Sequence, residues 1–424
     1  MLKKKNSDKK SLLLRNRNLS ILLIGQIISL FGSAIQRFAL SLYILDWTGS
    51  GSIFSMILAT SMVPIVLLAP IAGVLADRSS RKKIMVYLDF ISAGLMLLYT
   101  VIMASGKEGL IGIGALMFLL SMISTLYQPA VTASIPELTK EEDRMVANGL
   151  VYQISSLSNF LGPILAGLLY GFMGIQGIFI LNAISFFLSG VMECFLVMKP
   201  QPKMDSAEGV LSIFWSDIKE SSQYLKKDNR IVFRMIITSG LYNLFLVPVF
   251  SVGAPYIIKI TLGMSSEVYG IAEGIIAVGM IIGATIVSMK PDKFHIKTIY
   301  RLLYGTCMSM CCMGLSLLLP MGSANIRWVI LCSFTLFAMM IMLILGIANV
   351  VSATYIQGST TTNMLGKISA YSLAFATFCI PFGQMLFGYL LDILAGQTAV
   401  LVIGAAICSL FVTFIVRWNV RQIP

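Results

Sequence analysis

The sequence predicts an all-α polytopic membrane protein with twelve transmembrane helices, arranged as two six-helix halves related by pseudo-symmetry. Three observations lead to this prediction. Hydrophobic residues make up 57% of the 424 residues and charged residues only 12%, about half of the charged share of soluble proteins. Apolar runs long enough to cross a hydrocarbon core of about 30 Å recur along the whole chain. One long polar stretch divides these runs into six and six.

The expected spans are apolar runs separated by short polar or glycine-containing connections. They cover residues 19–45, 52–76, 84–104, 109–133, 145–171, 175–198, 233–260, 267–289, 297–319, 327–353, 368–394 and 398–417. The chain then divides into a cytoplasmic basic tail (1–18), an N-terminal six-helix half (19–198), a cytoplasmic linker with an amphipathic helix (199–232), a C-terminal six-helix half (233–417) and a cytoplasmic tail (418–424).

The distribution of Lys and Arg predicts the orientation. Among the 31 basic residues, Lys107, Lys259 and Arg327 fall on the outer side and Arg37 lies inside a span, whereas the others lie in inner segments. This asymmetry places both termini in the cytoplasm. The net charge of +12 is then a topology signal on a face that meets anionic lipid, and it gives no reason to expect nucleic acid.

Catalytic chemistry finds little support in the sequence. His295 is the only histidine and lies in a loop, which argues against histidine-based acid–base catalysis and against histidine metal sites. The polar linker is too short for an ATPase domain. We therefore expect no enzyme activity, no metal and no cofactor, and an ion gradient, most simply a proton gradient, as the driving force.

The positions of proline and glycine in the two halves suggest an internal duplication. Pro163 and Pro381 fall at similar depth in spans 5 and 11, and Gly73 and Gly283 end spans 2 and 8. In transporters built from paired repeats, the substrate site lies between the repeats near the middle of the membrane.

The loop after span 2 reads GVLADRSSRKK. Gly73 allows another helix to approach closely. Asp77 is placed to face cations or the N-terminus of another helix, a contact that would hold the halves closed on the inside. The loop resembles the signature G-x-L-a-D-r-x-G-r-k of the major facilitator superfamily, with Ser80 at the second glycine. The residues that carry the likeness are Gly73, Leu75, Ala76, Asp77, Arg78, Arg81 and Lys82.

Span 5 resembles the antiporter motif of the same superfamily, in which closely spaced glycines and a proline give a bend and a packing groove. The matching residues are Gly149, Ser158, Gly162, Pro163 and Gly167. Ser158 replaces a glycine of the motif and is small enough to keep the groove. In the family this motif accompanies export in exchange for protons. The alternative is the ordinary use of Gly and Pro in membrane helices.

A finer resemblance points to the macrolide-efflux-like branch of the superfamily, which also includes siderophore exporters. It rests on QIISLFGSAIQRFALSLYILDWTGS, APIAGVLADRSSRKK and YQPAVTASIPELTKEEDRMVANGL. The resemblance implies a bacterial cytoplasmic membrane. Many proton-coupled exporters of the superfamily carry an arginine in span 4 near a glutamine. Here span 4 has Gln128 but no basic residue, so that relay does not transfer.

Arg37 lies within span 1, where an arginine costs roughly 2.5–3.5 kcal/mol on insertion scales. Gln26, Ser29, Ser33, Arg37 and Ser41 follow one another at steps of three or four residues and form one polar stripe. Lipid would not tolerate this stripe, so it should line either the central cavity or a buried helix contact.

An intramembrane arginine needs an anion, and Glu273 in span 8 lies at similar depth. We expect Arg37 and Glu273 to face each other across the cavity, with Glu273 as proton carrier and Arg37 as the charge that tunes it. The alternative is that each residue finds its own partner, such as water or a headgroup, and that Arg37 anchors span 1. Asp89 and Glu193 lie nearer the inner side, and we expect ion pairs with the basic inner loops.

Other polar or aromatic positions are candidates for the cavity wall. They are Gln26, Ser29, Ser33, Gln128, Tyr152, Asn159, Asn243, Asn349, Phe378 and Gln384.

Together these observations predict a monomeric secondary transporter that exports amphipathic drug-like compounds of the macrolide type against protons, with membrane lipids as its other partners. Two alternatives stay open. One is a proton-coupled exporter of an endogenous solute such as a siderophore or a lipid-like compound. The other is a non-transporting membrane receptor on the same scaffold, which would need neither the loop motif nor the antiporter motif.

Overall fold

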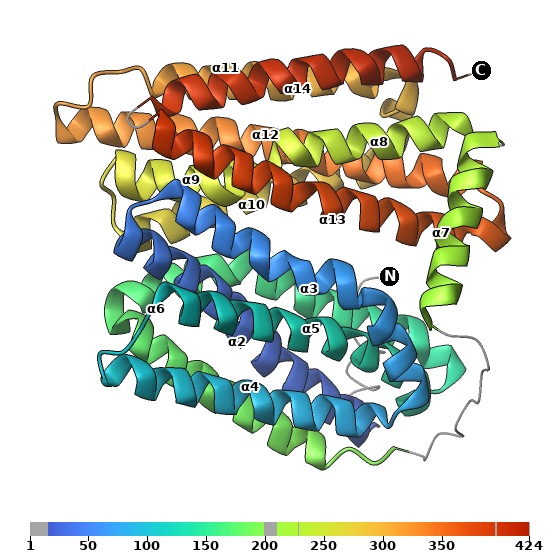
Figure 1. Cartoon of the computed structure of the whole chain (residues 1–424). Helices are drawn as coiled ribbons and strands as arrows, with labels where there is room; N and C mark the ends of the chain where they lie inside the picture. The colour runs from blue at the N-terminus through green and yellow to red at the C-terminus, as the bar shows by residue number, and fades with distance from the viewer. Residues whose placement is uncertain (1–15, 199–209, 228, 395–396, 424) are drawn as a thin grey trace. The chain divides into compact units, whose positions relative to one another are not determined.

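The computed structural model describes residues 16–198, 210–227, 229–394 and 397–423, and these are helical almost throughout (Figure 1). Most of the expected N-terminal tail and the first part of the linker lie outside the described residues. The helices group into two compact units. Unit 1 takes the described residues of 1–40 and 61–213, and unit 2 takes those of 41–60 and 214–424.

Unit 1 contains the helices that precede the linker, except for the end of α2 and the start of α3 (residues 41–60). They are α2 (Arg17–Thr48), α3 (Gly51–Arg78), α4 (Arg81–Ala104), α5 (Leu110–Leu138), the 3-10 turn η1 (Glu141–Asp143) and α6 (Arg144–Cys194). The helical dihedral angles of α6 continue through Pro163 and break at Gly174, where φ is 65° and ψ is −176°. A residue with a Cβ atom rarely adopts this conformation. The break falls between predicted spans 5 and 6, so α6 supplies both.

Unit 2 contains the remaining helices. They are α7 (Val210–Lys227, from Phe214 on), α8 (Arg230–Phe245), η2 (Val249–Gly253), α9 (Ala254–Tyr256), η3 (Ile257–Thr261), α10 (Ser266–Met289), η4 (Pro291–Lys293), η5 (Ile296–Thr298), α11 (Ile299–Ser316), α12 (Ala324–Ser359), α13 (Thr362–Ile393) and α14 (Thr398–Val420). The segments η2 and η3 are π-helical turns. Pro248 and Pro255 lie beside or between them, and because neither has an amide hydrogen, the regular α-helical pattern is interrupted there.

The helices account for the predicted spans. Within the described part of the chain, ten helical segments are long and apolar enough to cross a membrane. One of them, Glu141–Cys194, holds two spans because of the break at Gly174. The 18-residue helix α11 lies where span 9 is predicted. The prediction of an all-α polytopic membrane fold is therefore confirmed.

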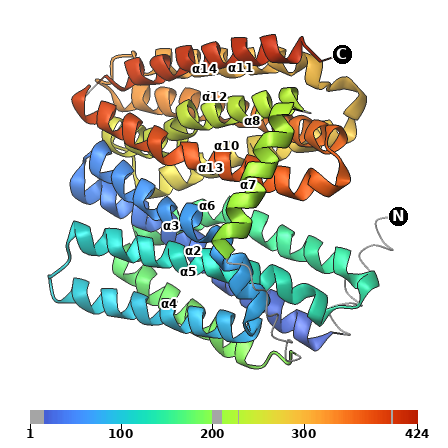
Figure 2. The same ribbon diagram turned by 45° about the vertical axis from the view of Figure 1, so that its right-hand side comes forward.

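The linker helix α7 forms where an amphipathic helix is predicted, and it crosses the direction of α8 and α13 near their ends (Figures 1 and 2). Leu225 of α7 is fully buried in a cluster with Val232, Ile236 and Ile368. Beside it, Nζ of Lys367 lies 2.6 Å from Oε2 of Glu220. The C-terminal part of this helix therefore packs on an apolar surface of unit 2.

Helices α10 and α12 pack backbone against backbone. A Cβ atom on Gly279 or Gly283 of α10 would overlap the carbonyl oxygen of Met339 or Leu343, and one on Gly346 of α12 would overlap the carbonyl oxygen of Met280. Glycines spaced four apart on one face allow this close approach in membrane helices. Gly283, predicted to end span 8 as the counterpart of Gly73, is therefore a packing residue.

Residues 41–60 pack with unit 2, whereas the sequence prediction placed them in the first half. This segment contains the end of α2 and the start of α3. A Cβ atom on Gly388 of α13 would overlap the side chain of Ser55 and the carbonyl oxygen of Gly51, so the start of α3 lies directly on α13. The ion pair between Asp46 and Lys259, with 3.0 Å between Oδ1 and Nζ, joins the end of α2 to η3.

Candidate functional site

Arg37 of α2 contacts an amide group of α6 in unit 1. Its Nη2 donates a hydrogen bond to Oδ1 of Asn159 in α6, at a distance of 3.4 Å. Both side chains are exposed. The structure thus brings together two predicted site residues from spans 1 and 5. A hydrogen bond of this length to a neutral group compensates a guanidinium charge only weakly.

Glu273 lies in α10 of unit 2, next to buried Tyr269 one turn earlier. Its Oε2 atom is buried and has no hydrogen-bond partner among the described residues. Buried carboxyl oxygens almost always have a partner, so an exception calls for an explanation. Arg37 and Glu273 belong to different units, and their pairing stays a prediction.

The loop motif between α3 and α4 is held mainly by its basic side chains. Arg81 donates from Nε to the carbonyl oxygen of Ala76 at 3.1 Å and from Nη1 to that of Ala133 at 2.6 Å. The same Nη1 lies 2.5 Å from Oε1 of Glu137 in an ion pair. Lys82 donates from Nζ to the carbonyl oxygen of Cys194, the last residue of α6, at 2.7 Å. The motif therefore ties α4 to the ends of α3, α5 and α6.

The structure gives less information on three other positions of the motif, Gly73, Asp77 and Arg78. The side chain of Asp77, the predicted latch, lies outside the described residues, and Arg78 is exposed. Around Gly73, no described atom of its unit lies within 4 Å of the place a Cβ would take. The close helix approach expected at Gly73 is not seen there.

The antiporter motif on α6 packs closely against α2 at one position. A Cβ on Gly162 would lie 2.6 Å from the Cβ of Ala34. Ser158 is buried and donates to the carbonyl oxygen of Ile154 at 2.9 Å. Gly167 is also buried, whereas Gly149 is exposed. The predicted groove thus exists around Gly162, where span 1 fills it.

The polar stripe of span 1 divides between the two environments expected for it. Gln26 and Ser29 are buried in a helix contact of unit 1, Ser33 is half-buried and Arg37 is exposed. Gln26 donates from Nε2 to the hydroxyl of Tyr127 in α5 at 2.7 Å. Ser29 donates to Oδ1 of Asp89 in α4 at 3.5 Å. The inner part of the stripe is therefore buried in contacts with neighbouring helices.

The remaining candidates for the cavity wall differ in exposure. Gln128, Tyr152, Asn349 and Phe378 are exposed. Asn243 is half-buried and donates from Nδ2 to the carbonyl oxygen of Ala376 at 3.1 Å.

Gln384 is buried and donates from Nε2 to the hydroxyl of Ser251 at 3.1 Å. Its Oε1 atom is buried without a hydrogen-bond partner among the described residues. That the exposed candidates line a cavity stays a prediction.

Asp392 at the end of α13 was not singled out from the sequence. Its carboxylate accepts hydrogen bonds from the hydroxyl of Ser50 at 2.6 Å and from the backbone amides of Gly51 and Ser52 at 2.7 and 3.0 Å. These groups form the N-terminus of α3, where amide donors and the helix dipole favour an anion. This is the kind of contact that was expected of Asp77, made here at the opposite, predicted outer end of α3.

Comparison with known proteins places this architecture among transporters. Macrolide efflux protein A of Streptococcus pyogenes is 26% identical over 226 residues, which are 53% of this chain and 55% of that protein. The match therefore spans about half the length of this relative. The "Putative bacilysin exporter BacE" of Bacillus subtilis is 25% identical over 400 residues, which are 93% of each chain.

Solved structures share the fold at low sequence identity. The nucleoside transporter NupG has a TM-score of 0.72 at 12% identity, over 95% of this chain and 98% of that chain. A bacterial homologue of the iron transporter ferroportin has a TM-score of 0.67 at 17% identity, over 94% and 98%. The family model described as Major Facilitator Superfamily matches residues 22–380. With the family model matching most of its length and the helices adopting the same fold, the chain belongs to the major facilitator superfamily of membrane transporters.

Proposed function

We propose that the chain is a secondary active efflux transporter of a bacterial cytoplasmic membrane, which exports amphipathic drug-like compounds of the macrolide type in exchange for protons. The name of the Streptococcus pyogenes relative supports the substrate class. The antiporter motif, with its close contact between Gly162 and Ala34, supports exchange.

The proposal of proton coupling rests on one observation, the burial of the Glu273 carboxyl group. Its Oε2 atom is buried without a partner among the described residues, and an ionised carboxylate in such a place is costly. A proton is the smallest partner that removes this cost. In one conformation Glu273 binds the proton, and in the other Arg37 or water takes its place beside the carboxylate and the proton leaves.

Alternating access requires contacts that open and close at both ends of the helices. At the predicted outer end, the candidates are the cap of α3 by Asp392 and the ion pair between Asp46 and Lys259, both within unit 2. At the predicted inner end, the candidates are the contacts of Arg81 and Lys82 within unit 1. Each set consists of a few hydrogen bonds and ion pairs, which exchange more readily than a packed apolar interface.

The experiment uses inside-out membrane vesicles from cells that lack their own drug efflux pumps. Radiolabelled erythromycin, a cationic dye and a catechol siderophore are each offered under a proton gradient, with and without a protonophore. We expect uptake of erythromycin that the protonophore abolishes. Vesicles with Glu273→Gln and vesicles without the protein serve as controls. Uptake of none of the three compounds contradicts the proposed substrate class.

A second candidate function is the export of an endogenous solute by the same proton exchange. The Bacillus subtilis relative named as an exporter aligns over almost the whole chain and supports this candidate. Uptake of the siderophore without uptake of erythromycin would favour it.

A further inference from the structure

Two acidic side chains lie in the interior of unit 1. Asp89 of α4 is 2% exposed and Glu193 of α6 is fully buried. The sequence suggested that each pairs with a basic inner loop. Among the described residues, however, the nearby Arg81 binds Glu137, and Lys82 binds the carbonyl oxygen of Cys194. The hydrogen-bond donors to Asp89 and Glu193 are instead neutral hydroxyl groups, those of Ser29 and Tyr127.

Hydrogen bonds connect both acids to α2, Glu193 through Tyr127 and Gln26 and Asp89 through Ser29. Tyr127 donates from its hydroxyl to Oε1 of Glu193 at 2.5 Å, and it accepts from Nε2 of Gln26 at 2.7 Å. The hydroxyl of Ser189 on α6 donates to the carbonyl oxygen of Gly25 on α2 at 3.2 Å and interacts with Asp89 and Tyr127. Four helices, α2, α4, α5 and α6, thus contribute to one buried polar cluster. Of the described residues that form this cluster, only Asp89 and Glu193 can carry a charge near neutral pH.

Three acceptor atoms of this cluster lack a donor. They are Oδ2 of Asp89, Oε2 of Glu193 and Oε1 of Gln26, each buried and without a hydrogen-bond partner among the described residues. Two ionised carboxylates in such a place would repel each other and would lack compensation for lost hydration. A bound proton or cation would supply the compensation that these acceptors need.

We propose that Asp89 and Glu193 form a carboxyl pair that binds a proton, so that unit 1 carries a proton-binding site separate from Glu273. The proton sits on one carboxyl group and supplies the missing donor to a free acceptor, while Tyr127 fixes the orientation of Glu193. That this site takes part in transport rests on the proposed proton exchange; that it binds a proton does not.

The chemistry of the cluster favours a proton over a metal ion. Calcium requires six to eight oxygen ligands and magnesium requires six in near-octahedral geometry. The described residues contain no group of three or more His, Cys, Asp or Glu side chains that could hold a metal ion. The Tyr127 oxygen already accepts one hydrogen bond and donates another.

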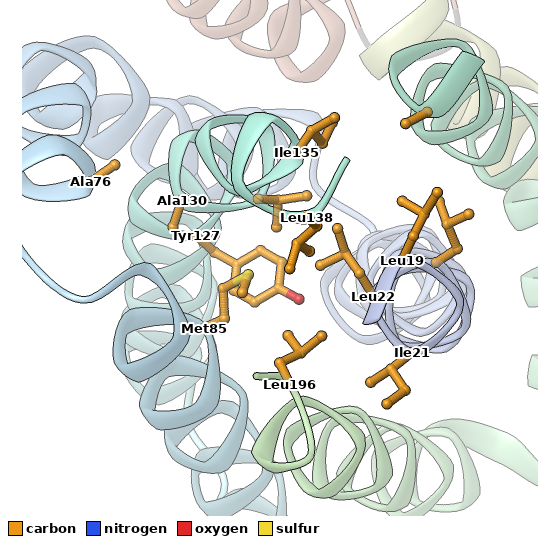
Figure 3. Close-up of a cluster of buried hydrophobic side chains, with 13 residues drawn as sticks. Leu19, Ile21, Leu22, Ala76, Met85, Tyr127, Ala130, Ile135, Leu138 and Leu196 are labelled. Atoms are coloured by element: carbon orange, nitrogen blue, oxygen red, sulfur yellow. The ribbon is translucent and has the colours of Figure 1, made fainter. Parts of the chain in front are cut away.

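An apolar cluster covers the site on the side of the loop motif. Figure 3 shows the Tyr127 ring among Leu22, Met85 and Leu196, with Leu138 nearby, and all of these residues are buried. Asp89 and Glu193 are themselves buried, so in the conformation of this structure the carboxyl pair is shielded from solvent.

The test measures protonated carboxyl groups by infrared difference spectroscopy on the purified full-length protein in lipid, titrated from neutral to alkaline pH. The background carries Glu273→Gln, which removes the other buried carboxyl group of interest. We expect a carboxyl C=O stretching band at neutral pH that disappears at alkaline pH. Asp89→Asn and Glu193→Gln should each remove or shift it, and Tyr127→Phe should shift its frequency while leaving the protein folded. Glu137→Gln, in the exposed pair with Arg81, is the matched control and should leave the band unchanged.

Two results would overturn this proposal. One is the absence of a protonated carboxyl band at neutral pH in the Glu273→Gln background, when size-exclusion chromatography shows folded protein. The other is a thermal stability that depends on Na⁺ and loses this dependence in Glu193→Gln, which would assign the site to a metal cation. If the Asp89 or Glu193 variant does not fold, the titration of the background protein and of Tyr127→Phe decides. Because this assay contains no substrate, its failure leaves the proposed transport function untouched.

Discussion

The carboxylate of Asp392 caps α3 through the backbone amide of Gly51, with 2.7 Å between Oδ1 and the amide nitrogen. The two residues are 341 positions apart in the chain. The contact therefore joins the start of span 2 to the end of span 11, and it is an electrostatic contact between an anion and a helix N-terminus.

Removing this cap should loosen the outer end of α3. Asp392→Ala should cost about 0.5–2 kcal/mol, the range for loss of an N-cap carboxylate, and should lower the midpoint of thermal unfolding. A cysteine introduced at Ser55, which is 1% exposed, should react faster with a membrane-impermeant thiol reagent in a background without reactive cysteines. Asp292→Ala, in the exposed turn η4, is the matched control. Equal labelling rates in Asp392→Ala and wild type would show that the cap does not hold this end closed.

The ion pair between Lys259 and Asp46 should stabilise the folded protein less than the Asp392 cap does. Its atoms are 3.0 Å apart, but the Asp46 side chain is 33% exposed, and pairs of this kind are worth about 0–1 kcal/mol. A double-mutant cycle with Lys259→Met and Asp46→Asn should return a coupling energy in this range that shrinks at high salt. A coupling above about 3 kcal/mol would indicate a far less hydrated pair.

Because α10 and α12 pack closely, alanine should destabilise the protein more at Gly283 of α10 than at Gly404 of α14. Gly283→Ala should destabilise the protein by about 1–3 kcal/mol, because its Cβ would overlap the carbonyl oxygen of Leu343. Gly404→Ala on α14 has no described atom within 4 Å of the new methyl group, and it should be neutral or slightly stabilising. Thermal unfolding of both variants in one detergent makes the comparison, and equal effects would contradict the packing described for α10.

Much of this structure follows from the sequence, but only where the signal is local. The spans, the glycine between spans 5 and 6, and the amphipathic linker helix are visible in runs of neighbouring residues. The helical period also grouped Gln26, Ser29 and Arg37 on one face. It did not show that this face meets a buried helix contact at Gln26 and an exposed Asn159 at Arg37, because that depends on which helices pack beside α2.

The roles of Tyr127 and Asp392 could not be predicted for the same reason. Tyr127 directly precedes Gln128, and choosing between them requires knowing which face of α5 turns toward α2. Asp392 resembles any polar residue at the end of a span until α3 is placed next to it. The ion pairs predicted for Asp89 and Glu193 are not seen among the described residues. The nearby side chains of Arg81 and Lys82 bind Glu137 and a backbone carbonyl instead.

Arg37 should matter for transport more than for folding. Its hydrogen bond to Asn159 is long, at 3.4 Å, so loss of this bond alone should leave thermal stability nearly unchanged. If Arg37 tunes Glu273, Arg37→Gln should shift the pH dependence of substrate uptake in vesicles, and Arg37→Lys should restore it in part. Asn159→Ala is the control that removes the neutral partner alone. A pH profile identical to wild type in Arg37→Gln would favour the interpretation that Arg37 anchors span 1.

The most direct measurement uses purified protein in liposomes that contain a pH-sensitive dye. Erythromycin is added under an imposed proton gradient, and the interior pH is followed over time. The account predicts proton movement that starts with substrate, is abolished in Glu273→Gln and is retained in Asp292→Asn, in the exposed turn η4. Substrate-driven proton movement that persists in Glu273→Gln would contradict the role of Glu273, and erythromycin transport without any proton movement would contradict proton exchange itself.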